Sequence, residues 1–229
     1  MVSAIVVAAG KGTRMRGAQP KQFLSLGGLP ILSRTLSVFD ACELVDQIVL
    51  VIAQDDFNSC RENILAPAGL AGKVVMAPGG MRRQDSVFNG LKAVDPGCSI
   101  VAIHDGVRPF LGNDQLVACI QGARETGACI VGVPAHETLK QANASNQILA
   151  TLARGDVWLA QTPQSFRYGL ICRAHERART EGYTATDDAE LVERLGESVK
   201  IIPGSRNNIK ITVKEDLETA QGLLLRAGR

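Results

Sequence analysis

The sequence of 229 residues predicts an α/β fold, a Rossmann-like three-layer sandwich with a mostly parallel sheet. Short apolar runs, typical of buried strands, alternate with stretches of helical periodicity through residues 1–134. This order favours parallel strands joined by right-handed crossovers, with helices on both faces of the sheet. We find no linker, repeat or low-complexity segment in the sequence, so we expect a single domain over residues 1–229.

The overall composition narrows the class of protein. Hydrophobic residues make up 45% of the chain, charged residues make up 21%, and the net charge is +2. These values are typical of a globular protein and do not predict a nucleic-acid partner. No apolar stretch approaches the length of a membrane span, and the six cysteines include no Cys-x-x-Cys spacing. We therefore expect a cytoplasmic protein with reduced thiols and no membrane partner.

The first predicted element is a strand over Ala4–Ala9, an apolar run with β-branched members that should be buried on both faces. It ends in Gly10–Gly12, whose backbone N–H groups could surround a polyphosphate together with Lys11, Arg14 and Lys21. Neither a P-loop nor the Gly-x-Gly-x-x-Gly dinucleotide fingerprint is present. The residues alone leave open an ordinary strand-to-helix turn with solvated charges.

The remaining elements of residues 1–134 follow from the same periodicities. We predict strands over residues 47–53, 73–77, 99–103 and 128–134. We predict helices that begin at Pro30, at Asp55 or Asp56, at Gln84 and at Asn113, the last of which ends at Gly127. The loops at 10–21, 79–86 and 104–109 should meet at one crevice, because ligands of such sheets bind beyond the carboxyl ends of the strands.

The alternation breaks at residues 136–156, where the sequence predicts a β-hairpin arm with a polar turn. A hairpin has little core of its own, so we expect the arm to pack on a second subunit. Beyond a short segment at 158–160 we predict a polar loop over 161–166, helices near 167–181 and 187–196, short strands over 199–203 and 209–212, and a terminal helix. Thr212 and Glu215 have the spacing of a capping box at the start of that helix.

Three groups of residues could carry chemistry in this scheme. Asp105 follows a buried strand beside Arg108, which suits a ribose hydroxyl, a divalent metal or a metal-bound water, although Asp105 could also cap the next turn. Gly80 and Ser86 offer bare backbone and a hydroxyl suited to a base edge, or an ordinary helix start. Lys210 alternates with apolar neighbours, so it faces either a ligand in the crevice or solvent at a sheet edge.

Taken together, these segments resemble the 2-C-methyl-D-erythritol 4-phosphate cytidylyltransferase family, nucleotidyltransferases of the nonmevalonate isoprenoid pathway. The matching motifs run in order from one end of the chain to the other. They are Ala8–Met15, Pro20–Gln22, Asp85–Val87, His104–Pro109, Glu137–Lys140, Arg154–Trp158, Gln161–Gln164, Thr186–Asp187 and Asn208–Thr212. The resemblance implies the nucleotide-diphospho-sugar transferase type of fold and a homodimer with shared active sites, in which the arms serve dimerisation.

The resemblance also implies a reaction. A cytidylyl group passes from CTP to 2-C-methyl-D-erythritol 4-phosphate, giving 4-diphosphocytidyl-2-C-methyl-D-erythritol and pyrophosphate, with Mg²⁺ as the divalent metal. Catalytic roles are implied for Arg14, Lys21, Arg154 and Lys210. Nucleotide contacts are implied for Ala8, Ala9, Gly10, Lys11, Gly12, Gly80, Ser86 and Asp105. Acceptor contacts are implied for Asp105, Arg108, Thr138, Arg154, Thr162 and Lys210.

The residue types agree with this chemistry. The attacking group would be a phosphate oxygen that is already ionised at neutral pH, so the reaction needs held anions and neutralised charge rather than a general base. We accordingly expect His104 to be a hydrogen-bonded structural residue. Val7, Gly106 and Val107 depart from the commoner residues of the family, and we interpret them as tolerated packing changes.

Two other functions stay open from the sequence alone. Ribitol-5-phosphate cytidylyltransferases share the opening loop and Gln161–Phe166, whereas Thr138–Lys140 favours methylerythritol phosphate as the acceptor. A non-catalytic nucleotide-binding module of the same fold is expected to lose Arg14, Lys21 or Lys210, and all three are present.

Overall fold

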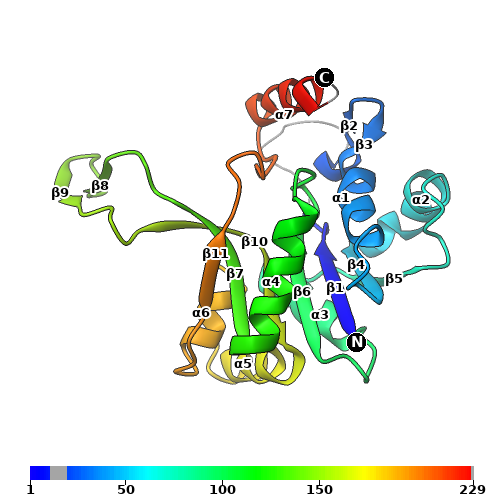
Figure 1. The fold of residues 1–229 in the computed structure, drawn as a ribbon, viewed down its shortest axis with the longest axis horizontal. Helices are drawn as coiled ribbons and strands as arrows, with labels where there is room; N and C mark the ends of the chain where they lie inside the picture. Colours follow the sequence, from blue (N-terminus) through cyan, green and yellow to red (C-terminus); the bar gives the residue numbers. More distant parts are fainter. Residues whose placement is uncertain (11–19, 228–229) are drawn as a thin grey trace.

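A seven-stranded, mostly parallel sheet forms the centre of the molecule (Figure 1). The computed structural model describes residues 1–10 and 20–227. The strand order is β11-β7-β10-β6-β1-β4-β5. Parallel pairing joins β6 (Ile100–Asp105), β1 (Val2–Val7), β4 (Gln47–Ile52) and β5 (Val74–Pro78), and it also joins β11 (Lys200–Pro203) to β7 (Ala128–Pro134). The predicted parallel sheet is therefore confirmed.

Helices cover both faces of this sheet. One face carries α1 (Ile31–Asp40), α2 (Phe57–Cys60) and α4 (Asn113–Thr126), and the other carries α3 (Arg83–Lys92), α5 (Tyr168–Thr180) and α6 (Asp188–Glu193). In β1, Ala4 and Val6 belong to the core on the first face while Ile5 belongs to the core on the second. Burial on both faces explains the unbroken apolar runs. The three-layer α/β fold is confirmed.

A smaller third core lies under the C-terminal helix α7 (Lys214–Ala227). Its buried members are Leu26, Ile31, Val107, Ile211 and Ala220. They bring together α7, the segment before it, the loop after β6, and the hairpin of β2 (Ser25–Leu26) and β3 (Leu29–Pro30). This hairpin follows the short helix η2 (Lys21–Phe23). The third core thus holds the segments that carry Lys21 and Lys210 beside the end of β6.

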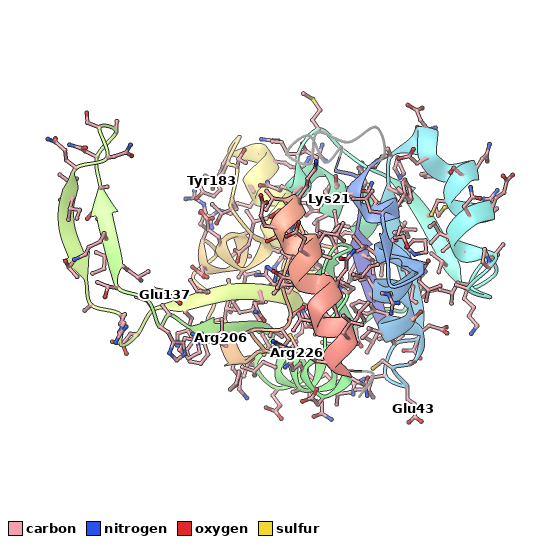
Figure 2. The ribbon with its side chains drawn as sticks, turned by 90° about the horizontal axis from the view of Figure 1, so that it is seen from above. Lys21, Glu43, Glu137, Tyr183, Arg206 and Arg226 are labelled. Atoms are coloured by element: carbon pink, nitrogen blue, oxygen red, sulfur yellow. The ribbon has the colours of Figure 1, made fainter. Side chains whose placement is uncertain are left out.

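The predicted hairpin arm is present and projects away from the sheet (Figures 1 and 2). Its strands, β8 (Leu139–Ala142) and β9 (Ile148–Leu152), pair only with each other among the described residues. Ile148 is 64% exposed and Leu149 is 61% exposed. An arm with exposed apolar side chains agrees with the expectation that it packs on another surface. Among the described helices, none has the length and apolarity needed to cross a bilayer.

The polar loop predicted over residues 161–166 is wrong. Residues 158–167 form β10 (Trp158–Arg167), which lies inside the sheet and runs antiparallel to both β6 and β7. Its side chains are polar yet buried because they have partners: Gln161 donates to the backbone oxygen of Ser205, and Gln164 donates to Asp187. Because these bonds satisfy the buried amides of Gln161 and Gln164, this part of the strand needs no apolar pattern.

Three helix starts and one strand also differ from the prediction. The helix predicted from Asp55 or Asp56 consists of η3 (Gln54–Asp56), α2 and the π-helical turn η4 (Arg61–Leu65). Asp56 directly precedes α2, but its side chain makes no capping hydrogen bond. Gly112 rather than Asn113 precedes α4, which ends at Gly127 as predicted. Thr212 donates to Asp216 rather than to Glu215. Residues 209–212 are not a strand, since the backbone N–H of Ile211 bonds the loop residue Val107 instead of a neighbouring strand.

Candidate active site

The loops that follow β1, β5 and β6 meet at one cavity of about 920 Å³. Its lining includes the predicted nucleotide-binding residues Ala8, Ala9, Gly10, Gly80, Ser86 and Asp105, together with Lys21 and Lys210. The structure therefore brings these predicted residues together at the carboxyl edge of the sheet, as expected for such folds. Lys11, Gly12 and Arg14, which were also predicted, lie outside the described residues.

Close backbone contact shapes the wall of this cavity. A Cβ atom on Gly80 would lie 2.4 Å from the Cβ of Asp85, so the turn before α3 requires glycine there. The Ser86 hydroxyl accepts a 2.9 Å hydrogen bond from the Gly80 N–H and donates to the Arg82 carbonyl at 3.1 Å. Ser86 consequently fixes the turn whose backbone lines the cavity, and its hydroxyl proton is directed at the protein.

The Asp105 carboxylate, at the end of β6, lies close to three cationic side chains. Its Oδ2 lies 2.9 Å from Lys210 Nζ and 3.6 Å from Arg108 Nε, and its Oδ1 lies 3.1 Å from Arg83 Nε. Burial raises the pKa of Asp105, but Arg83, Lys210 and Arg108 outweigh it and hold that pKa well below its usual range. Lys210 thus points into the crevice, which is one of the two orientations that the sequence left open, although its segment is not a strand.

A second cavity of about 250 Å³ adjoins the first. It is lined by Arg108, Thr162 and Gln164, and it shares Arg83, Asp105 and Lys210 with the larger cavity. Arg108 and Thr162 are both predicted acceptor-binding residues. The arrangement places two cavities side by side, with Asp105 and its cations at their boundary.

His104 lies behind this boundary and is fully buried. Its Nε2 is 3.1 Å from the Arg108 carbonyl, which only accepts, so Nε2 carries the proton. Nδ1 then accepts from the Thr162 hydroxyl at 3.0 Å, and Thr162 Oγ1 accepts from the Asp105 N–H at 3.1 Å. Burial lowers the pKa of His104 to about 4, so the ring is neutral at physiological pH. The structural role predicted for His104 is confirmed.

Two predicted site residues do not reach these cavities. Thr138 and Arg154 are exposed on the arm, and the Arg154 guanidinium donates to the backbone oxygen of His136. Figure 2 shows Glu137 where the arm leaves the body of the molecule. Since the arm extends outward, Thr138 and Arg154 lie away from the site formed by their own chain.

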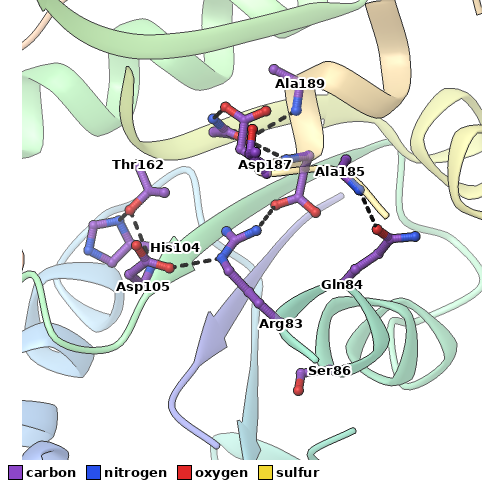
Figure 3. Close-up of polar contacts among 12 residues, drawn as sticks. Arg83, Gln84, Ser86, His104, Asp105, Thr162, Ala185, Asp187 and Ala189 are labelled. Carbon is purple, nitrogen blue, oxygen red and sulfur yellow. Dashed lines mark hydrogen bonds and ion pairs between the residues drawn. The ribbon is translucent and has the colours of Figure 1, made fainter. Parts of the chain in front are cut away.

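The sequence left Arg83, Gln164 and Asp188 without a role, and the structure connects them to Asp105 and to the start of α6. Arg83 Nη1 lies 2.7 Å from Asp188 Oδ2, so Arg83 bridges Asp105 and the start of α6 (Figure 3). Gln164 accepts from the backbone N–H of Asp188 at 3.0 Å and donates to Asp187 at 2.7 Å. A cation in the first turn of a helix opposes the helix dipole, and this was the available signal that Arg83 needs a carboxylate partner.

The side chains that line the cavities can be compared with the ligands that Mg²⁺ prefers. Among the described residues, no three His, Cys, Asp or Glu side chains are grouped so as to hold a metal. Mg²⁺ typically takes one or two carboxylates and fills its remaining positions with water and substrate phosphates. Asp105, which is 9% exposed and lines both cavities, provides one such carboxylate. The residues present therefore fit a metal that arrives with a triphosphate.

Comparisons with known proteins show the family of this chain. The family described as 2-C-methyl-D-erythritol 4-phosphate cytidylyltransferase matches residues 2–226. A cytidylyltransferase of that name from Pelotomaculum thermopropionicum is 45% identical over 229 residues, covering 100% of this chain and 96% of the relative. One from Geobacter metallireducens is 46% identical over 226 residues, covering 97% of each.

Solved structures give the same result. The 4-diphosphocytidyl-2C-methyl-D-erythritol synthase of Anaerococcus prevotii superposes with a TM-score of 0.86 at 34% identity, covering 98% of this chain and 96% of that one. The 2-C-methyl-D-erythritol 4-phosphate cytidylyltransferase of Francisella tularensis superposes with a TM-score of 0.82 at 34% identity, covering 96% and 98%. On its fold, its site and these matches, the chain belongs to the 2-C-methyl-D-erythritol 4-phosphate cytidylyltransferase family.

Proposed function

We propose that this cytidylyltransferase joins CTP to 2-C-methyl-D-erythritol 4-phosphate. The observation that carries the proposal is the pair of adjoining cavities with Asp105, Lys210 and Arg83 at their boundary. The larger cavity, of about 920 Å³, suits the nucleotide, and the smaller one, of about 250 Å³, suits the phosphate end of the acceptor. Two bound anions would then meet beside these cations.

The reaction follows from that placement. A phosphate oxygen of the acceptor attacks the α-phosphorus of CTP, a new P–O bond forms, and the bond to the β-phosphate oxygen breaks, so that pyrophosphate leaves with the electron pair. No proton transfer is required, since the attacking oxygen is ionised. Lys21 and Arg14 stabilise the charge that develops on the α-phosphate, and Lys210 positions the acceptor phosphate. Mg²⁺, when bound, would supply further charge neutralisation, and Asp105 would be one of the residues that hold it.

The acceptor half of the site is completed by a second subunit in this proposal. Arg108 and Thr162 line the smaller cavity, whereas Thr138 and Arg154 lie on the outward arm. A homodimer places the arm of one protomer over the site of its partner, which covers the exposed apolar residues of β9 and supplies Arg154 to the acceptor phosphate. The reaction takes place in the cytoplasm.

Pyrophosphate release tests the proposed substrates. With CTP and Mg²⁺, we expect the protein to release pyrophosphate on addition of 2-C-methyl-D-erythritol 4-phosphate and much less on addition of ribitol 5-phosphate. The family match favours the first acceptor. Equal or reversed turnover with the two acceptors contradicts the substrate assignment, and absence of release with both contradicts the proposed activity.

A further inference from the structure

A buried polar chain runs from the active site into the core between α3, α5 and α6. It begins at Asp105 and passes through Arg83, which lies 3.1 Å from Asp105 and 2.7 Å from Asp188. It continues from Asp188 Oδ1 to His175 Nε2 at 3.3 Å. The Asp188 side chain is 1% exposed and the His175 side chain is 0% exposed, so neither can contact a substrate directly.

Asp188 is held in one orientation by its surroundings. Its backbone N–H donates to Gln164 Oε1, one carboxylate oxygen meets Arg83, and the other meets His175. The His175 ring is itself stacked on Phe88 of α3, with ring centroids 6.2 Å apart. Burial raises the pKa of Asp188, but Arg83 and His175 outweigh it, and the pKa lies below its usual value. Asp188 is therefore an oriented, ionised carboxylate behind Arg83.

Arg83 has a different position, because it lines both substrate cavities. Its Nε and Nη1 atoms bind the two carboxylates, while its Nη2 has no hydrogen-bond partner among the described residues. A guanidinium with two of its nitrogens anchored keeps the third in a set direction. Without Asp188, Arg83 would keep Asp105 as its carboxylate partner but could rotate about its side-chain bonds, which would loosen its contact with Asp105 Oδ1.

We propose that Asp188, backed by His175, is a positioning residue for the transfer reaction. It holds the Arg83 guanidinium against Asp105, which in turn sets Lys210 at the boundary of the two cavities. The inference rests on the proposed function. It assigns Asp188 and His175 a role in turnover although they lie outside both cavities, and it makes Arg83 the group through which they act.

A double-mutant cycle in the full-length enzyme tests this role. Asp188→Asn keeps the side-chain shape and removes the charge, and we expect kcat to fall about 10- to 100-fold because positioning is lost, with KM for both substrates changing by less than about threefold. In an Arg83→Met background, we expect Asp188→Asn to have no further effect on kcat. Glu193→Gln, which removes an exposed carboxylate from the same helix, is the matched control.

The proposal is overturned if Asp188→Asn lowers kcat by the same factor in the wild-type and Arg83→Met backgrounds. It is also overturned if Asp188→Asn and Glu193→Gln have equal kcat values. If Asp188→Asn does not fold, His175→Phe replaces it, since this change keeps a ring beside Phe88 and removes the bond to Asp188. We expect it to lower kcat several-fold in the wild-type background and not in the Arg83→Met background. An unchanged kcat for His175→Phe in the wild-type background overturns the proposal.

A measurement independent of turnover separates this inference from the proposed function. The Arg83 Nε–H, bound to Asp105, should give a slowly exchanging ¹⁵N–¹H signal that disappears in Arg83→Met. We expect Asp188→Asn, or His175→Phe in its place, to speed exchange of that signal at least tenfold, and unchanged exchange contradicts positioning through Arg83. If the wild-type enzyme releases no pyrophosphate, the proposed function fails. The exchange measurement still tests whether Asp188 positions Arg83 against Asp105.

Discussion

Gly79 and Ala9 are in such close contact that a Cβ atom built on Gly79 would lie 2.2 Å from the Cβ of Ala9. The contact joins the loop after β5 to the loop after β1 across the wall of the larger cavity. The Gly79 N–H also bonds the backbone oxygen of Ile52, so the loop has little freedom to withdraw. The distance between these two cavity-lining loops is thus set by the absence of a Cβ atom on Gly79.

Gly79→Ala should therefore weaken both folding and turnover. We expect the free energy of unfolding to fall by about 1–3 kcal/mol, since overpacking forces the backbone to shift, and KM for CTP to rise because the cavity wall moves. Denaturant unfolding and pyrophosphate release measure the two effects. Gly72→Ala is the control, because a Cβ on Gly72 has no atom within 4 Å. Equal stabilities of the two variants would contradict the contact.

Lys21→Ala should reduce turnover much more than binding. Lys21 lines the larger cavity, and the proposed charge that it neutralises develops only as pyrophosphate leaves. We expect kcat to fall about 100- to 1000-fold with little change in KM for the acceptor. Steady-state kinetics measure both constants, with Lys73→Ala as a control for loss of an exposed lysine that pairs only with Asp40 at 3.0 Å among the described residues. A change confined to KM would argue against a role in the transition state.

His104 should make stability depend on pH between about 4 and 6.5. Burial lowers its pKa from 6.5 to about 4, so over that range the unfolded chain takes up a proton that the folded chain does not. The stabilising contribution is complete above pH 6.5 and is lost as pH falls to 4, by up to about 3 kcal/mol. Denaturant unfolding at a series of pH values measures this slope.

His104→Gln should flatten that pH slope. His136→Gln, which changes an exposed histidine, should leave it as in the wild type. If the slopes of the wild type and of His104→Gln coincide between pH 4 and 6.5, then His104 does not titrate as its burial indicates.

Subunit mixing should show whether the arm acts on the partner. Arg154→Ala and Lys210→Ala should each be inactive alone. A heterodimer of the two contains one site with both residues intact, so an equal mixture that exchanges subunits should recover about a quarter of wild-type activity. Mixing Lys21→Ala with Lys210→Ala, both on the body of the chain, should recover none. Failure of the first mixture to recover activity under exchange would place Arg154 in the site of its own chain.

The strands and the main loops of the site were predictable because their signals are local. Apolar runs such as Val49–Ile52 are buried on both faces, and the polar residues that end them lie at the carboxyl edge of the sheet. Gly80 and Asp105 were found in this way, whereas Lys210 was a candidate because it alternates with apolar neighbours in a segment that is not a strand. The resemblance of ordered motifs then gave the family, and the family match confirmed it.

By itself, the sequence determined the layered α/β fold, the arm and the cationic character of the crevice, since each depends on periodicity or on residues close together in the chain. Only the tertiary structure decided that Gln161–Phe166 lies in an interior strand, because hydrogen bonds to distant residues compensate for burying its glutamine side chains. It also decided that Arg83 meets Asp188, 105 positions away. A buried ion pair needs a partner at a set distance in space, and the chain order does not contain that distance.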